Sequence, residues 1–411
     1  MRAPFVSPRK TEERQMTQFR RLIRHCYENV PFYRKRLVEN GLTPDDFHFP
    51  DDIARIPVLN KDEYKENMVD FFPGGTRRDR LVPFRSTGST GEPTLFYASR
   101  EYEILRGFIH LRCLLLAGVG LLDRQLRFLA EPRVKNRTDL FQKLGIYEVR
   151  NLSAGADLSR VLSEIRAYRP HVILLTPSYL EMLCDSLDPA ETDRVRRSLK
   201  RVITRSEVLY PDVREIAESR LGVPVRDFYG LSEFGFVAAE ADDSHGYHIA
   251  EDVNIVEIAE ATLPDGTVEE KDIIVTALYN FAMPLIRYNT RDKAELSTAS
   301  DGKMRFRRMQ KILGRSDDFI LLPDGSRVNP LLVTDALVEI PGMVRFRIFQ
   351  ESARLTITIQ MKENQRLGEF ETRLRKNLGE LTKGHLQMDI QCVSHLDIDK
   401  TGKHRRIHRK S

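Results

Sequence analysis

The sequence has few cysteines and no long apolar run. Its 411 residues include four cysteines that lie far apart and form no Cys-x-x-Cys pair: Cys26, Cys113, Cys184 and Cys392. This spacing fits a reducing compartment and argues against a zinc knuckle. No run approaches the roughly 18 apolar residues of a membrane span, and the first residues lack the apolar segment of a secretory signal. We therefore expect a cytoplasmic protein without a membrane span.

The sequence also lacks internal repeats, low-complexity segments and a strong charge of either sign. Its 65 Lys and Arg residues nearly balance 60 Asp and Glu residues, and part of the net charge of +5 lies in a C-terminal tail. This charge is a weak attraction for nucleic acid, so we expect no nucleic-acid partner. The composition, with 41% hydrophobic and 30% charged residues, is that of an ordinary globular protein. The length allows two or three domains of about 150 residues.

A loop rich in glycine and hydroxyl side chains lies between two strand-like runs. It consists of Ser86, Thr87, Gly88, Ser89, Thr90 and Gly91, between the apolar residues 81–84 and 95–97. Such a loop presents N–H and O–H donors to an anion. It is not a Walker P-loop, because no Gly-Lys-Ser/Thr follows. On composition alone, an anion-binding loop and a simple turn are equally good interpretations.

Strands and helices alternate in the middle of the chain, between residues 157 and 229. This alternation predicts a parallel sheet with right-handed crossovers, in which ligands bind beyond the carboxyl ends of the strands. Three polar loops follow these ends, at residues 176–179, 205–207 and 229–233. The last loop combines an aromatic face with a glycine and a carboxylate. We therefore predict a pocket formed by these loops.

The remainder of the chain predicts smaller subdomains. Short alternating segments with Asp-Gly turns predict an antiparallel sheet or barrel, with strands at 255–258, 273–278, 294–296 and 304–307. Helices and strands beyond it predict a small α+β domain of about 90 residues, followed by the basic, flexible-looking residues 400–406. The predicted fold class is α/β: a large N-terminal domain with mainly parallel sheets and a small β-barrel-like subdomain, and a small α+β C-terminal domain.

Five short motifs follow one another along nearly the whole chain. They are residues 86–94, which end in Pro-Thr, then Tyr229-Gly230-Leu231-Ser232-Glu233, residues 287–292, residues 314–318, and Thr401-Gly402-Lys403. In this order they resemble the motifs of the adenylate-forming enzymes, the superfamily of acyl-CoA synthetases, adenylation domains and luciferases. The phenylacetate–CoA ligase-like branch is the most similar. Residues 29–33 and 56–61 also resemble this branch.

The resemblance implies a two-step reaction. A carboxylic acid, an aryl acid being one candidate, attacks the α-phosphate of Mg-ATP and gives an acyl-adenylate and pyrophosphate. A thiol, usually that of coenzyme A, then takes the acyl group and releases AMP. The implied cofactors are ATP, Mg2+ and coenzyme A. A carrier-protein phosphopantetheine is the alternative to coenzyme A. The implied partners are a small carboxylic acid and coenzyme A or a carrier protein, and a homodimer is left open.

The resemblance also implies roles for individual residues. The catalytic pair is Lys403, which bridges the carboxylate and the α-phosphate, and Glu233, which helps to hold magnesium. Residues Ser86, Thr87, Gly88, Ser89, Thr90 and Gly91 cradle the β- and γ-phosphates. Ser206, Glu207, Asp227 and Tyr229 surround adenine, and Phe228, Gly230 and Ser232 belong to the same nucleotide-binding set. Asp292 and Arg315 bind the ribose region, and Asp317 and Asp318 are the pivot of a hinge.

The same motifs suggest domain boundaries. Residues 1–75 would be an N-terminal helical arm of the large domain and residues 76–313 the adenylate-forming core. Residues 314–318 would be the hinge and residues 319–411 a small mobile C-terminal domain. In the family this small domain rotates about the hinge between the two half-reactions.

The sequence departs from the family pattern in two places. In the motif before Asp292, Arg291 stands where the family has glycine and Asn289 where it has arginine, which leaves the shape of this loop open. Many members have a zinc site, but its cysteines are replaced here by Ala241 and by residues 311–315. A lone histidine such as His248 is more often a surface or core residue than a zinc ligand. We predict no structural zinc.

Other interpretations stay open at the level of sequence. Lys403 lies in a basic tail, and charge runs are usually solvated. Glu207 and Asp227 are equally good as structural carboxylates. Within the superfamily, the acyl group can pass to a carrier protein or an amine, as in natural-product or polysaccharide biosynthesis. Outside it, a non-catalytic nucleotide-binding relative would also fit the Arg291 departure.

Overall fold

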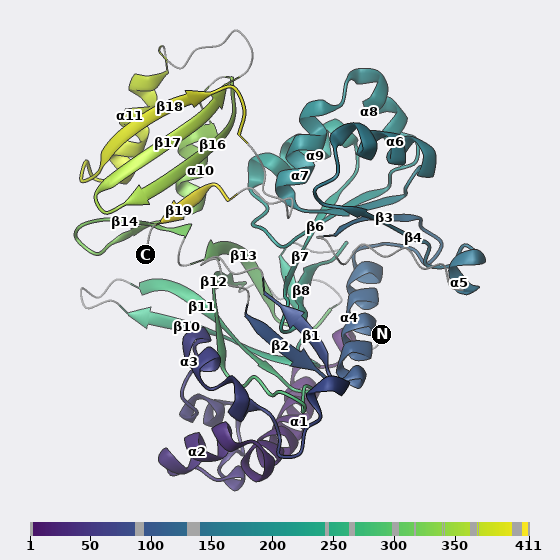
Figure 1. Cartoon of the computed structure of the whole chain (residues 1–411), viewed down its shortest axis with the longest axis vertical. Coiled ribbons are helices and arrows are strands. Elements are labelled where there is room, and N and C mark those ends of the chain that lie inside the picture. The colour runs from purple at the N-terminus through teal and green to yellow at the C-terminus, as the bar shows by residue number, and fades with distance from the viewer. Residues whose placement is uncertain are drawn as a thin grey trace. The chain divides into compact units, whose positions relative to one another are not determined.

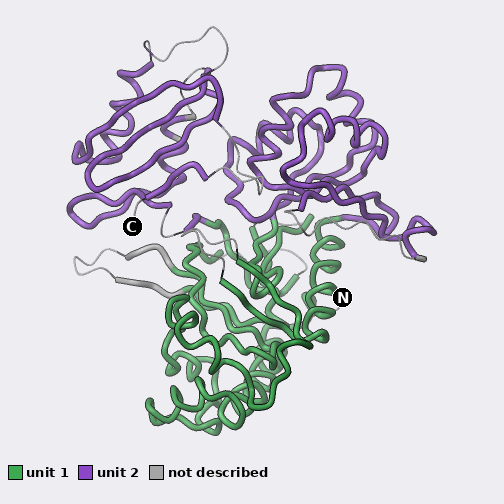
Figure 2. The backbone as a smooth tube through the Cα atoms, in the orientation of Figure 1, with its two compact units in different colours: residues 1–118, 228–312 green, residues 119–227, 313–411 purple. Residues whose placement is uncertain are grey.

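The computed structural model describes most of the chain and divides it into two compact units (Figure 2). The described residues are 3–86, 94–129, 140–242, 246–262, 268–297, 304–315, 318–338, 340, 342–361, 368, 370–396 and 405–409. Unit 1 comprises residues 1–118 and 228–312, and unit 2 comprises residues 119–227 and 313–411. Each unit is therefore assembled from two separate stretches of sequence. The domain boundaries expected from the motifs remain predictions.

Unit 1 begins with a helical arm. Helix α1 (Pro8–Asn29) and helix α2 (Pro31–Glu39) meet at Val30, whose extended backbone is the conformation that a following proline favours. Pro31 cannot donate the N–H that would continue α1, and it starts α2 at a position that needs no donor. Helix α3 (Lys61–Glu66) follows. Short 3₁₀ helices cover Ala3–Phe5, Pro44–Asp46, Pro50–Arg55, Met68–Phe71 and Arg78–Arg80.

A hairpin and a long helix follow the arm (Figure 1). Strands β1 (Val82–Arg85) and β2 (Leu95–Ala98) pair antiparallel, from Val82 opposite Ala98 to Arg85 opposite Leu95. Helix α4 (Arg100–Leu116) starts where the Ser99 hydroxyl accepts the Tyr102 N–H at 3.2 Å. This cap satisfies one of the donors that every helix start leaves open.

The remaining strands of unit 1 form an antiparallel region. In sheet order they are β10 (Asn254–Thr262), β11 (Val268–Ala277), β12 (Tyr288–Leu296), β13 (Arg308–Arg315), β9 (Tyr247–Ile249), β8 (Gly235–Glu240) and β7 (Val225–Leu231). Strands β7 and β13 continue into unit 2 along the chain. The pairs β10/β11, β11/β12, β13/β9, β8/β9 and β7/β8 are antiparallel.

One predicted strand of this region is wrong. Residues 304–307 do not pair in a sheet, and the strand begins at Arg308 instead. Met304 and Phe306 are buried as in a strand, but the Arg305 N–H donates to the Pro4 carbonyl at 2.6 Å. An alternating apolar pattern fits an extended segment held by another part of the chain as well as it fits a strand.

The first part of unit 2 is the parallel α/β layer predicted from the strand–helix alternation. Strands β3 (Gln125–Leu129), β4 (Val149–Ser153), β5 (Val172–Leu175) and β6 (Arg201–Arg205) pair in parallel, in the order β6-β5-β3-β4. The helices are α5 (Leu140–Lys143), α6 (Leu158–Tyr168), α7 (Pro177–Ser186), α8 (Pro189–Arg196) and α9 (Pro211–Leu221). In Figure 1, α6 to α9 lie on one side of these strands. The α/β fold class is therefore confirmed.

The second part of unit 2 is an α+β layer. Its four-stranded sheet has the order β18 (Gln387–Val393), β17 (Arg354–Met361), β16 (Met343–Glu351) and β19 (Ile407–Arg409). Helices α10 (Pro330–Val338) and α11 (Glu371–Leu381) share one apolar core with β16 and β17. A two-stranded ribbon, β14 (Ile320–Leu321) and β15 (Arg327–Val328), precedes α10.

The described end of the chain, residues 405–409, is held on a sheet, whereas residues 400–404 of the segment expected to be flexible lie outside the described residues. Strand β19 pairs in parallel with β16, with Ile407 opposite Ile348. The Ile407 side chain is only 1% exposed. The basic composition of this segment concealed one apolar residue whose burial fixes residues 405–409 on the sheet.

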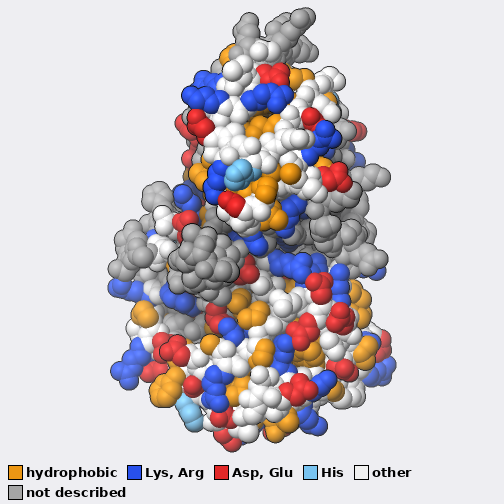
Figure 3. Space-filling model, turned by 90° about the vertical axis from the view of Figure 1, so that its left-hand side faces the viewer, with side chains coloured by type: hydrophobic (Ala, Val, Ile, Leu, Met, Phe, Trp, Pro, Cys, Tyr) orange, Lys and Arg blue, Asp and Glu red, His pale blue; other side chains and the backbone are white. Residues whose placement is uncertain are grey.

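The cysteines, the apolar character of the helices and the charge distribution on one face can be compared with the sequence analysis. All four cysteines are described and unpaired; Cys26, Cys113 and Cys184 are buried and Cys392 is exposed. Burial raises the pKa of the Cys113 and Cys184 thiols to about 12. Within the described ranges, no helix combines the length and the apolar character needed to cross a membrane. On the face drawn in Figure 3, acidic and basic side chains are interspersed.

Arg287 gives a test of how the helical arm is held in unit 1. Its backbone carbonyl accepts the Leu59 N–H at 2.9 Å, and its guanidinium donates to the Ala54 carbonyl at 2.7 Å and pairs with Glu257 at 2.9 Å. We expect Arg287→Met to lower the free energy of unfolding by about 2 kcal/mol, because partly buried acceptors lose their donor. Urea unfolding measures this. The exposed pair Arg9–Glu13 supplies the control: Arg9→Met should cost less than about 0.5 kcal/mol, and equal losses would contradict the role of Arg287.

Candidate functional site

Two predicted site residues of unit 1 are joined by a direct hydrogen bond. Tyr229 on β7 and Asp292 on β12 are 63 positions apart in sequence, and the Tyr229 hydroxyl donates to Asp292 Oδ2 at 2.7 Å. The Thr290 hydroxyl accepts the Asp292 N–H at 3.2 Å and donates to the Ile273 carbonyl at 2.8 Å. Tyr229 is 8% exposed and Asp292 is 7% exposed. A carboxylate held this firmly has a fixed direction for accepting the hydroxyl groups of a ligand.

The turn that carries Glu233 depends on a close backbone approach. A Cβ on Gly230 would lie 2.7 Å from the Gly235 carbonyl oxygen, and Gly235 itself has a φ of +77°. A side chain at either position would force the turn apart. The glycine of the Tyr-Gly-x-Ser-Glu motif is therefore required by packing, whatever it contributes to a ligand.

Arg106 on α4 supports the same turn and was not found from the sequence. Its Nη2 donates to the Ser232 carbonyl at 2.9 Å, and its guanidinium carbon lies 4.1 Å from the centre of the Phe84 ring on β1. Arg106 thus connects the residue before Glu233 with the strand that leads to Ser86. The only signal in the sequence was a cation within a helix, which is usually a solvated residue.

Glu233 is buried and influences a neighbouring tyrosine. Burial raises the pKa of the Tyr64 hydroxyl, and electrostatic interactions with Tyr97 and Glu233 add to the increase. Tyr64 therefore stays protonated and donates to the Leu95 carbonyl at 2.7 Å. A single carboxylate beside phosphate oxygens is a usual magnesium environment, so Glu233 fits a metal ion held mainly by a nucleotide.

No metal site formed by protein ligands alone is found in the part of the chain that the structure describes. No group of three or more His, Cys, Asp or Glu residues there could hold an ion. His248, the histidine of the absent zinc motif, lies buried on β9 opposite Arg308 on β13.

In sequence, the predicted Ser/Thr/Gly loop lies between the paired strands β1 and β2. Its two ends are closed by a pair of hydrogen bonds: the Ser86 N–H donates to the Thr94 carbonyl at 2.9 Å, and the Thr94 N–H donates to the Ser86 hydroxyl at 3.2 Å. Ser86 and Thr94 therefore hold the two ends of this segment together. The predicted phosphate-binding residues Thr87 to Gly91 lie outside the described residues.

The two departures in the motif before Asp292 compensate for each other. Arg291 has a φ of +62°, in the left-handed region that glycine adopts without strain. The Asn289 side-chain oxygen accepts the Arg291 N–H at 2.7 Å, and the Arg291 guanidinium pairs with Asp62 on α3 at 2.7 Å. An asparagine that hydrogen-bonds the backbone two residues later is a known way to stabilise such a turn. Arg291 thus has, within β12 where its pairing with β11 shifts register, the left-handed backbone that glycine adopts without strain.

In unit 2, the predicted carboxylates at the strand ends are held by hydroxyl groups. The Thr204 hydroxyl on β6 donates to Asp227 Oδ1 on β7 at 2.6 Å. Glu207 Oε2 accepts the Ser178 N–H at 3.0 Å and the Ser178 hydroxyl at 2.6 Å, so Glu207 caps the first turn of α7. These bonds support a structural role for both carboxylates and also fix the loops that contain them.

Ser206 lies between these groups in an unusual backbone conformation. It is exposed, and its φ is +74°. A non-glycine residue in this region costs on the order of 1 kcal/mol and is found mainly at binding and catalytic sites. The strain marks the carboxyl end of β6 as a candidate ligand-binding position.

The predicted hinge is only partly described. Asp318 Oδ2 accepts the Arg315 N–H at 2.9 Å, and Asp318 Oδ1 accepts a hydrogen bond from the Arg405 guanidinium. Gly314, the penultimate residue of β13, has a φ of +102°. Asp317 and the predicted catalytic residue Lys403 lie outside the described residues.

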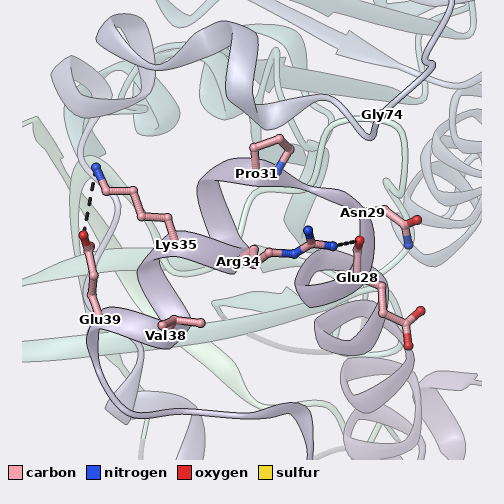
Figure 4. A pocket seen from close by; sticks show the side chains of 8 residues that line it. All are labelled: Glu28, Asn29, Pro31, Arg34, Lys35, Val38, Glu39 and Gly74. Carbon is pink, nitrogen blue, oxygen red and sulfur yellow. Dashed lines mark hydrogen bonds and ion pairs between the residues drawn. The ribbon is translucent and has the colours of Figure 1, made fainter.

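A depression on unit 1 contains none of the predicted site residues (Figure 4). It is lined by α1, α2 and Gly74. The Arg34 guanidinium donates to the Tyr27 carbonyl at 2.7 Å and so caps the last turn of α1, and Lys35 pairs with Glu39 at 3.9 Å. Arg34 and Lys35, two of its charged side chains, therefore already have partners within the two helices.

Comparisons with known proteins agree with these features. A family model described as AMP-binding enzyme matches residues 149–268. The chain is 27% identical over 408 residues to a phenylacetate–coenzyme A ligase of Pseudomonas putida, covering 91% of this chain and 90% of the relative. It is 29% identical to a phenylacetate–coenzyme A ligase of Escherichia coli K12, covering 87% and 85%.

A solved structure has the same fold over the whole chain. It is a 2-hydroxyisobutyryl-CoA ligase in complex with R3-HIB-AMP, with a TM-score of 0.80, 18% identity, and coverage of 100% of this chain and 91% of the other. The chain thus has the fold of the adenylate-forming CoA ligases. Over most of its length it also resembles the phenylacetate–coenzyme A ligases in sequence, so the resemblance predicted from the motifs is confirmed.

The Arg291 loop gives a stability test. We expect Arg291→Gly to change the free energy of unfolding by less than about 1 kcal/mol, because relief of the left-handed backbone offsets the loss of a partly exposed ion pair. Arg291→Val should cost about 2 kcal/mol, because a β-branched side chain is strained at positive φ. Urea unfolding measures the free energy of unfolding of both variants. A valine variant as stable as the wild type would contradict the left-handed conformation of residue 291.

Proposed function

We propose that this protein is an AMP-forming acid–thiol ligase that activates a carboxylic acid with ATP and transfers the acyl group to coenzyme A. The observation that carries the proposal is the Tyr229–Asp292 hydrogen bond, which joins two separate nucleotide motifs in one buried pair. The similarity to phenylacetate–coenzyme A ligases over most of the chain supports the same reaction.

In the first half-reaction, an oxygen of the substrate carboxylate attacks the α-phosphorus of ATP, and the bond to the pyrophosphate oxygen breaks. We assign the β- and γ-phosphates to residues 86–91, which lie between β1 and β2 in sequence. Asp292 would accept the ribose hydroxyls in the direction that Tyr229 fixes, with Arg315 beside them. Lys403 would offset the charge that develops at the reacting oxygens, which is a large contribution in such reactions.

We assign the adenine ring to the loops at the strand ends. Tyr229 offers an aromatic face and Gly230 leaves room beside it, together with Phe228 and Ser232. Ser206, Glu207 and Asp227 would form the polar part, held by Ser178 and Thr204. Mg2+ bound with ATP would be held by Glu233 and would supply charge neutralisation of the phosphates.

In the second half-reaction, the thiol of coenzyme A attacks the acyl carbonyl and AMP leaves. The proposal includes the hinge at residues 314–318, with Asp317 and Asp318 as pivot, and a mobile C-terminal domain at 319–411. A carrier-protein phosphopantetheine or an amine is the alternative acceptor. A non-catalytic role loses its main support, because the Arg291 loop keeps the backbone that glycine would give. A cytoplasmic location and a homodimer remain predictions.

The substrate class is tested by pyrophosphate exchange. Purified protein with Mg-ATP and labelled pyrophosphate is supplied with single aryl, fatty or amino acids, and we expect at least one acid to raise exchange about tenfold or more over the rate without acid. If ATP binds but no acid supports exchange, the ligase proposal is wrong. If exchange occurs and coenzyme A yields no thioester, the acceptor is a carrier protein or an amine.

Lys403 is tested with a neighbouring lysine as control. We expect Lys403→Ala to lower acid-dependent exchange by about 100-fold or more and to leave the Kd of ATP within about threefold, because its charge acts mainly in the transition state. Lys400→Ala, which removes a lysine from the same basic segment, should leave exchange nearly unchanged. Equal losses in the two variants would assign Lys403 to the general charge of the tail.

A further inference from the structure

A buried arginine near the end of the chain contacts two helices of the same unit. Arg406, which precedes β19, is 7% exposed. Its Nη2 lies 3.2 Å from Glu181 Oε1 on α7 and 3.1 Å from Asp212 Oδ2 on α9. These acceptors are 225 and 194 positions away in sequence. The contact therefore joins the α7–α9 layer of unit 2 to its C-terminal sheet.

The surroundings of Arg406 complete a cluster of balanced charge. Its guanidinium carbon lies 4.2 Å from the ring centre of Tyr210 and 5.4 Å from that of Phe346, and Arg345 Nε lies 3.4 Å from Glu181 Oε2. Burial raises the pKa of the Glu181 carboxyl, and the nearby Arg406 and Arg345 oppose that increase. Two arginines and two carboxylates, Arg345, Arg406, Glu181 and Asp212, form what we call the Arg406 cluster.

The preceding residue makes a second attachment in another direction. The Arg405 guanidinium donates to Asp318, whose other oxygen accepts the Arg315 N–H at 2.9 Å. The backbone directly after Arg406 is fixed as well, because the Arg406 carbonyl accepts the Ile348 N–H at 2.8 Å. Consecutive arginines thus tie the chain end to the predicted hinge and to two helices.

A contact of this kind suits an interface that must open. A buried ion pair gives little net stability over an apolar contact of the same size, because both partners lose their hydration. The ion pair instead provides geometric specificity, because the planar guanidinium fixes both the angle and the distance of its carboxylate partners. When the contact opens, all four charges regain water, whereas an apolar interface would leave exposed hydrophobic surface.

We propose that the Arg406 cluster is a reversible anchor that holds Arg406 against α7 and α9 during adenylation, and that Arg406 is a positioning residue for that half-reaction. Lys403 is three residues before Arg406 in sequence, so anchoring Arg406 limits where the lysine can reach. The proposal rests on the proposed ligase function. It assigns Glu181, Asp212 and Arg406 a role that none of the five motifs contains.

The test separates the two half-reactions in the full-length protein. Arg406→Met keeps an unbranched stem about as long as the Cβ–Nε part of arginine and removes the charged end. We expect it to lower acid-dependent pyrophosphate exchange by about 10- to 100-fold, since a small misplacement of a reacting group has effects of this size. Thioester formation from supplied acyl-adenylate and coenzyme A should stay within about twofold of the wild type, because the anchor is open in that step. Glu181→Gln should show the same split more weakly.

The control and the double variant exclude a purely structural effect. Arg375→Met removes an exposed arginine of α11 that pairs with Glu371 at 2.7 Å and should leave both half-reactions unchanged. Adding Arg406→Met to Lys403→Ala should cause almost no further loss of exchange, because residues that act through each other are not additive. Equal loss in both half-reactions, or full additivity, would overturn the proposal.

A readout without substrate distinguishes failure of the anchor from failure of the ligase function. If the wild type shows no exchange with any acid, the ligase function fails, and the anchor is judged by trypsin cleavage after Arg315 in the hinge. Arg406→Met should be cut several-fold faster there than Arg375→Met, since an open anchor exposes the hinge. Equal cleavage rates would mean that the Arg406 cluster does not restrain the chain end.

Discussion

A buried carboxylate needs donors, and the candidate site depends on how this need is met. Asp292 receives the Tyr229 hydroxyl, Asp227 receives the Thr204 hydroxyl, and Glu207 receives both donors of Ser178. In each pair the donor and the acceptor come from different segments of the chain, so the bond fixes two segments at once. The carboxylates are thereby oriented by the fold before any ligand arrives, and a ligand need not supply that order.

Much of the architecture could be predicted from the sequence because its signals are local. The apolar run at β5 and the periodic helix α6 predicted the parallel layer, and the polar residues at the strand ends predicted where a site would form. The Tyr229–Asp292 bond, the support of Ser232 by Arg106 and the partners of Arg406 could not be predicted. These contacts join residues more than 60 positions apart, and no spacing along the chain encodes them.

The departures from the family motif show the difference between a residue and the conformation it serves. Arg291 lacks the freedom of glycine, yet its backbone is left-handed, because Asn289 supplies an acceptor and Asp62 receives the side chain. Compared position by position, the motif has lost its glycine and its arginine. In the structure, the two replacement residues together keep the left-handed backbone conformation at residue 291. Residues 304–307 show the converse case. Their alternating apolar pattern is typical of a strand, yet they form none.

The burial of three cysteines has a practical consequence for following this protein in solution. Cys26, Cys113 and Cys184 are buried, with thiols held protonated, whereas Cys392 on β18 is exposed. A fluorescent or spin-label maleimide should therefore attach to the unaltered chain at one position, on the C-terminal sheet. Among the four cysteines, Cys392 thus gives the native sequence one exposed attachment point for a spectroscopic probe on the C-terminal sheet.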